Sequence, residues 1–168
     1  MFGLGGTSKI DFLHNKIDES DLFANPSKDS YFTSDIGLVG VKHFIKLNEK
    51  SYFNSVIGAT YNGSEFLEDH VVLEPKSVDR DIENKTSQIH YSINSSFNSK
   101  INSKMFVKIG FISELIQLDL DAREKISDTL WNHYWDFKDR SYLHQAYAQG
   151  KYRFNEKFTL NIGVHGQY

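Results

Sequence analysis

The chain has 168 residues and a formal net charge of −3, which allows one domain with a core and gives no electrostatic reason to expect a nucleic-acid partner. It has no cysteine, so disulfides, zinc–thiolate sites and thiol nucleophiles are excluded. Aromatic residues reach 14% and are mostly Tyr and Phe, which favours β structure, and no apolar run approaches the ~18 residues of a membrane helix.

Apolar and polar side chains alternate with period two in several segments, which predicts strands with one apolar and one polar face. In chain order these segments are 33–47, 51–62, 88–97, 105–112, 145–154 and 158–168. The last is the clearest, because Leu160, Ile162 and Val164 alternate with Asn161 and Gly163. Segment 33–47 fits less cleanly, since its apolar residues fall on both faces.

Two kinds of connection alternate between these segments. Short polar turns are predicted at 47–50, 98–104 and 155–157, and long acidic or aromatic loops at 15–30, 64–85 and 118–140. Aromatic side chains crowd the strand ends next to the short turns. The pattern predicts an all-β, antiparallel, up-and-down arrangement of about six to seven strands, each roughly 12–15 residues long, with the first and last incomplete.

Short turns at one end, long loops at the other and an aromatic-bounded apolar face are typical of a transmembrane β-barrel, with turns on the periplasmic side and loops outside the cell. We expect these strands to form a partial barrel. The polar face would then line the lumen, and we expect His90, Asn94, Asn161 and His165 to meet a plug or water there. The alternative is an antiparallel sheet of a soluble sandwich, which also alternates.

The stretches GLGGTSKIDF and LDAREKISDTLWNHYWDFKDR and the two Asn-Glu-Lys turns resemble the barrel of TonB-dependent outer-membrane receptors of the Bacteroidetes type. The resemblance covers essentially all of 1–168 and is strongest over 120–168. It implies that 1–168 is an internal piece of a 22-stranded barrel. The plug domain and signal peptide of such a receptor have no counterpart in these residues.

The resemblance also implies a function and partners. Such a receptor lies in the cell outer membrane, contacts its lipid, and holds a plug domain inside the barrel. It binds a small-molecule nutrient (an iron chelate, vitamin, glycan or peptide) and imports it with energy from a TonB-type coupling protein, reached through the missing N-terminal part.

Trp131, His133, Tyr134 and Trp135 form the densest aromatic cluster, within the predicted outer loop 118–140. Trp and Tyr are common binding anchors, so these four are the candidate ligand-binding residues. The competing interpretation is that they pack the loop against its neighbours or extend the upper aromatic girdle. Acidic groups in 64–85 and 118–140 do not match a calcium loop, so we expect solvated charge and no metal site.

No catalytic arrangement or cofactor motif is present, and we expect neither enzyme activity nor a cofactor. Two further function classes remain open. A passive porin-like barrel would show the same alternation. A soluble β-sandwich module could bind carbohydrate through Trp131 and Trp135.

Overall fold

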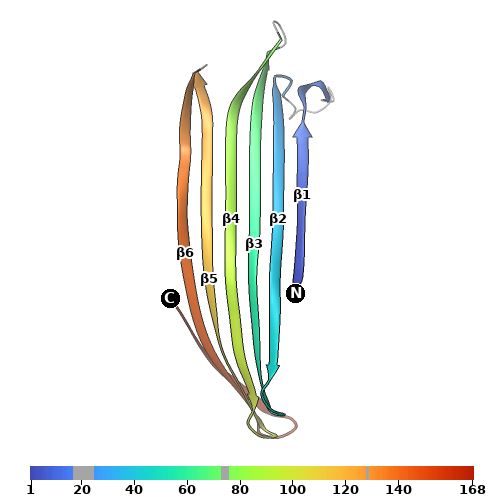
Figure 1. Ribbon diagram of the computed structural model, residues 1–168, viewed down its shortest axis with the longest axis vertical. Coiled ribbons are helices and arrows are strands. Elements are labelled where there is room, and N and C mark those ends of the chain that lie inside the picture. Colours follow the sequence, from blue (N-terminus) through green and yellow to red (C-terminus); the bar gives the residue numbers. More distant parts are fainter. Residues whose placement is uncertain (17–24, 73–75, 128) are drawn as a thin grey trace.

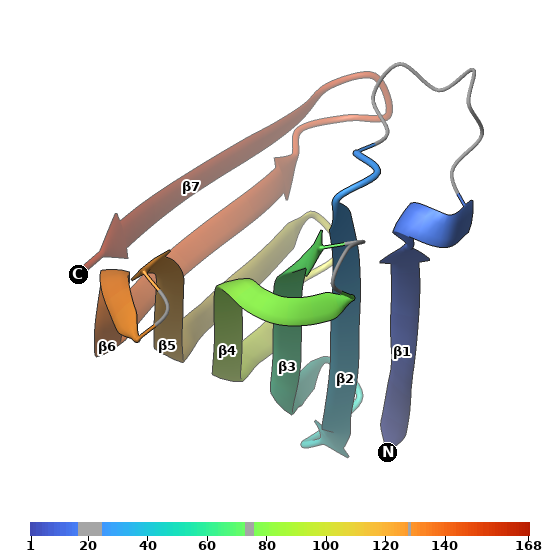
Figure 2. The same cartoon turned by 90° about the horizontal axis from the view of Figure 1, so that it is seen from above.

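The computed structural model describes residues 1–16, 25–72, 76–127 and 129–168. They form one sheet in which each strand pairs antiparallel with the next in chain order, from β1 at one edge to β7 at the other (Figures 1 and 2). The strands are β1 (Phe2–Phe12), β2 (Lys28–Lys46), β3 (Ser51–Val72), β4 (Ser77–Lys100), β5 (Met105–Ser127), β6 (Leu130–Arg153) and β7 (Thr159–Gln167). The predicted all-β, up-and-down arrangement is confirmed, and the sheet is open within the described residues.

The other regular element is a short 3-10 turn, η1 (His14–Lys16), after β1. Among the described residues, no helix has the length and apolar character needed to cross a membrane.

The three short turns share one construction, which the sequence shows as Asn-X-Lys. In each, the asparagine Oδ1 accepts a hydrogen bond from the backbone N–H of the lysine, an arrangement that mimics a backbone turn. The distances are 2.8 Å for Lys50 to Asn48, 2.8 Å for Lys104 to Asn102 and 2.9 Å for Lys157 to Asn155. We call the end of the strands where these three turns lie the turn end; it is at the bottom of Figure 1. The opposite end of the strands is the far end.

Two of the predicted long loops are wrong. Segment 64–85 belongs mostly to β3 and β4, which are separated by 73–76, and 118–140 belongs to β5 and β6, which are separated by 128–129. The strands continue because their charges pair across the sheet, as in Glu65–Lys85 at 2.9 Å and Lys138–Asp119 at 2.5 Å. The third, 15–30, lies largely in the connection between β1 and β2, and its residues 17–24 fall outside the described chain.

The ladder register assigns side chains to two faces, because directly paired residues of neighbouring strands share a face. Ile57 pairs with Ile93, and Phe97 pairs with Ile109, which defines an isoleucine face. The opposite face carries the residues next in sequence; Asn54, Asn94 and Asn161 lie on it, and we call it the asparagine face.

The sheet is a single bent layer without a second layer against it among the described residues (Figure 2). Val71 is the one large apolar side chain there that is fully buried, at 2% exposure. By contrast Ile57, Ile109 and Val164 on the isoleucine face are 57%, 52% and 70% exposed. Such a face is stable in water only if something covers it, since exposed apolar area is unfavourable.

Candidate functional surfaces

The half of the isoleucine face nearest the turn end forms an apolar band. In β5 the band runs from Met105 to Leu115, eleven positions or about 35 Å along the strand at ~3.4 Å per residue. A transmembrane β-strand needs about 9–11 residues, so the band has that height. No Lys, Arg, Asp or Glu lies on this part of the face in β2–β7.

Two pairs of serine hydroxyls inside the band form hydrogen bonds with each other. The Ser51 and Ser99 hydroxyls are 2.8 Å apart across β3 and β4, and so are those of Ser55 and Ser95. The band is slightly hollowed over β2–β5, where a groove of about 640 Å³ is lined mainly by aliphatic side chains and glycine. The apolar surface is therefore continuous over most of the sheet.

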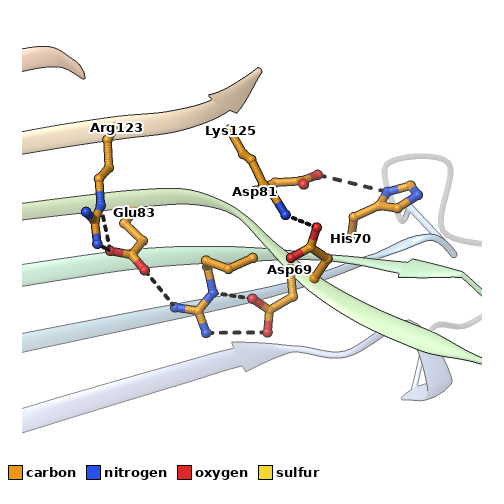
Figure 3. Close-up of polar contacts among 8 residues, drawn as sticks. Asp69, His70, Asp81, Glu83, Arg123 and Lys125 are labelled. Atoms are coloured by element: carbon orange, nitrogen blue, oxygen red, sulfur yellow. Dashed lines mark hydrogen bonds and ion pairs between the residues drawn. The ribbon is translucent and has the colours of Figure 1, made fainter. Parts of the chain in front are cut away.

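Towards the far end, the same face becomes charged. Glu83 lies between two guanidinium groups (Figure 3): Arg123 Nη2 is 2.5 Å from Glu83 Oε2, and Arg80 Nη1 is 4.0 Å from Glu83 Oε1. Arg80 also donates to Asp69, and this hydrogen bond is the main cause that raises the pKa of Arg80. Neighbouring pairs join Lys125 to Asp79 and His70 to Asp81.

These pairs account for several of the acidic groups that the sequence placed in loops, including Glu65, Glu83 and Asp119. No cluster of three or more metal-ligating side chains occurs in the part of the chain that the structure describes.

The asparagine face changes polarity in the opposite sense. In β5 and β6 it carries Lys108, Gln149 and Lys151 near the turn end, whereas towards the far end it carries Leu118, Leu120, Phe137 and Trp135. The exchange is visible within β5 alone, since LDLDAREK places leucine and alanine on one face and Asp119, Asp121, Arg123 and Lys125 on the other. In β5 and β6 each face is therefore apolar over one half only.

The four residues predicted to face a lumen do share the asparagine face. His90 Nε2 lies 3.5 Å from Glu114 Oε1, and His165 Nε2 lies 3.0 Å from Gln145 Oε1. Asn94 pairs with Ile112, and Asn161 pairs with Lys151. That this face borders a lumen stays a prediction.

The four aromatic-cluster residues do not lie in a loop, because all belong to β6. A β-bulge at Tyr134 also separates them. The Trp131 ring is 4.9 Å from the Arg123 guanidinium carbon, and His133 Nδ1 is 3.5 Å from Asp121, both contacts on the isoleucine face.

Trp135 instead pairs with Ala122 on the asparagine face and is 64% exposed. Tyr134 donates to Glu124, and this hydrogen bond is the main cause that raises the pKa of the tyrosine hydroxyl. The cluster predicted from sequence is therefore divided between the two faces, and only Trp135 joins the apolar part of the asparagine face.

One group of cationic side chains was not predicted from the sequence. At the turn end, Lys100, Lys104, Lys151 and Arg153 line a pocket of about 400 Å³. Lys100 and Lys151 are 51 residues apart, at the turn ends of β4 and β6, and lie close together only through the sheet register. The sequence does show lysines concentrated around the three turns.

No protein-family model, no curated protein and no solved structure matches this chain.

Proposed function

We propose that this chain forms part of the wall of an outer-membrane β-barrel, and that the complete barrel is a TonB-dependent receptor that imports a nutrient. The observation that carries the proposal is the apolar band on the isoleucine face. It is exposed, free of charge and eleven residues high in β5, and it ends where the charge network begins.

A lipid environment explains this pattern better than water does. In a soluble sandwich a second sheet covers the apolar face of the first. No second sheet is present among the described residues. Beyond the height of a bilayer a barrel wall faces water outside, which suits the charged far end of the isoleucine face. The asparagine face then lines the lumen, next to the plug domain.

The face assignment is tested with neighbouring residues. The chain has no cysteine, so Ile93→Cys and Asn94→Cys each introduce one reactive thiol within residues 1–168, on opposite faces. The product of the whole reading frame containing these residues is labelled with an environment-sensitive fluorophore in vesicles containing spin-labelled lipid. We expect lipid quenching at position 93 and none at 94. Equal quenching at both, or none at either, contradicts the proposed membrane wall.

Active import and passive diffusion are separated by the energy source. A TonB-dependent receptor loses uptake when the inner-membrane coupling protein is deleted, whereas a porin-like barrel does not. Sequencing the DNA on both sides of the codons for residues 1–168 gives an independent check. A TonB-dependent receptor requires an upstream region that encodes a plug domain. Uptake that persists without the coupling protein would support the porin-like alternative.

A further inference from the structure

The pocket at the turn end concentrates positive charge. Its lining includes Lys100, Lys104, Lys151 and Arg153 together with the turn residues Asn102 and Ser103, and no carboxylate lines it. All four cationic side chains are exposed.

The pairing of β4, β5 and β6 brings these cationic side chains close together. Lys100 pairs with Phe106, and Phe106 pairs with Lys151, so the two lysines flank one phenylalanine on the asparagine face. Neighbouring strands are about 4.8 Å apart, which sets the two lysine backbones about 10 Å apart. Arg153 follows two positions after Lys151 on the same face, and its backbone N–H donates to the Lys104 carbonyl at 2.8 Å.

These cations lack the counter-charges found elsewhere in the protein. At the far end Lys138 and Arg123 each have a carboxylate oxygen at 2.5 Å. Within the described residues, none of the four turn-end cations lies within 4.0 Å of a carboxylate. Like charges held near one another by the backbone repel, and a multiply charged anion bound among them removes that repulsion.

The shape and side chains indicate which anion fits. Lysine offers point charges and arginine a planar fork of donors, and the two together are the usual partners of phosphate groups. The pocket, at about 400 Å³, has room for a small molecule. It opens on the asparagine face, opposite the apolar band, which favours a soluble anion over a lipid headgroup.

We propose that Lys100, Lys104, Lys151 and Arg153 form a binding site for a soluble anion that carries two or more phosphate charges. The site is independent of nutrient import. It needs only the pairing of β4, β5 and β6 in the observed register.

The test uses inorganic pyrophosphate as the probe and calorimetric titration of the whole protein at low ionic strength. β6 provides a matched pair of variants, because the Lys-X-Arg spacing of Lys151 and Arg153 recurs at Lys138 and Arg140. Lys151→Gln/Arg153→Gln and Lys138→Gln/Arg140→Gln change net charge equally. The second pair lies on the isoleucine face, where Lys138 contacts Asp119.

We expect saturable one-to-one binding, weakened roughly 30- to 100-fold by the turn-end double substitution and less than about twofold by the far-end one. Lys151→Arg keeps the charge and should keep the affinity, which separates loss of the site from misfolding. Equal weakening by both doubles, or no saturable binding to the wild type, overturns the proposal.

Two further probes distinguish the source of the charge. Phosphatidylglycerol vesicles and a hexaglutamate peptide are titrated in parallel with pyrophosphate. If only the vesicles, or only the peptide, depend on Lys151 and Arg153, the soluble phosphate site is refuted. The Ile93 and Asn94 labelling result is unaffected by any of these outcomes, so the two proposals fail separately.

Discussion

A lysine in the apolar band should destabilise the protein in proportion to its depth. Ile109 is the fifth of the eleven band positions in β5, about 14 Å along the strand from Met105, and is 52% exposed. Its neighbours on the same face are Phe97 and Ala148. A lysine at the mid-plane of a bilayer costs about 2–4 kcal/mol in a barrel strand, and one near the interface about 0–1 kcal/mol.

We therefore expect Ile109→Lys to lower the free energy of unfolding by about 2–4 kcal/mol and Met105→Lys by about 0–1 kcal/mol. Ile112→Lys is the matched control, because Ile112 lies three positions further on, on the asparagine face, between Asn94 and Gln145. Its cost should stay below about 1 kcal/mol, since the lysine would join polar neighbours.

The assay is equilibrium unfolding in guanidinium with the protein in phospholipid vesicles, followed by tryptophan fluorescence and extrapolated linearly to zero denaturant. On the exposed surface of a soluble sheet, Ile109→Lys would change stability by no more than about 0.5 kcal/mol. Equal, small effects at 105, 109 and 112 would thus refute a lipid-facing band.

Three further outcomes test individual contacts. Asn102→Ala removes the two hydrogen bonds that the side-chain oxygen accepts from the backbone N–H groups of Lys104 and Met105, and should cost about 1 kcal/mol, measured by the same unfolding titration; no loss would show that the turn does not need the asparagine. Glu83→Gln should cost about 0.5–1 kcal/mol at low salt and less at 1 M salt, because its partner Arg123 is 37% exposed; a salt-independent loss would indicate a packing effect instead. For Asp29, burial alone would raise the carboxyl pKa, but hydrogen bonds from the His14 backbone N–H at 2.6 Å and its ring at 2.7 Å outweigh it and lower the pKa. The resulting stability, about 1–3 kcal/mol, is present above the ordinary pKa of about 4 and is lost as pH falls through the lower folded-state pKa. Asp29→Asn should therefore be less stable than the wild type at pH 7 and equally stable in strong acid, and a constant difference would refute the assignment.

The fold was predictable where one face stayed apolar along a segment. Period-two alternation placed strands at 51–62, 88–97 and 105–112, and all three lie within observed strands. It failed at 118–125, because the polarity of the two faces exchanges there and the charges of Asp119 and Asp121 suggested a solvated loop. Sequence alone does not show that these carboxylates have partners on neighbouring strands.

The functional surfaces depended on register, which no single strand contains. The bulge at Tyr134 shifts Trp135 to the face opposite His133, although the two are only two positions apart and alternation would place them together. Register likewise sets Lys100 and Lys151 on either side of Phe106. Such placements come from pairing between strands, so the aromatic cluster was predicted where none forms and the cationic pocket was missed.

Charge is distributed unevenly along the strands, and this bears on how an anion could reach the pocket. The turn-end segments 42–50, 100–108 and 151–157 contain nine Lys and Arg and two Glu, a net +7, and the remaining chain carries −10, which together give the total of −3. A wall with this asymmetry attracts anions at its turn end more than along the rest of its strands, over distances of about a Debye length, ~8–10 Å at physiological salt. A phosphate-bearing ligand should therefore enter from the turn end, and its association rate, more than its dissociation rate, should fall as salt is raised.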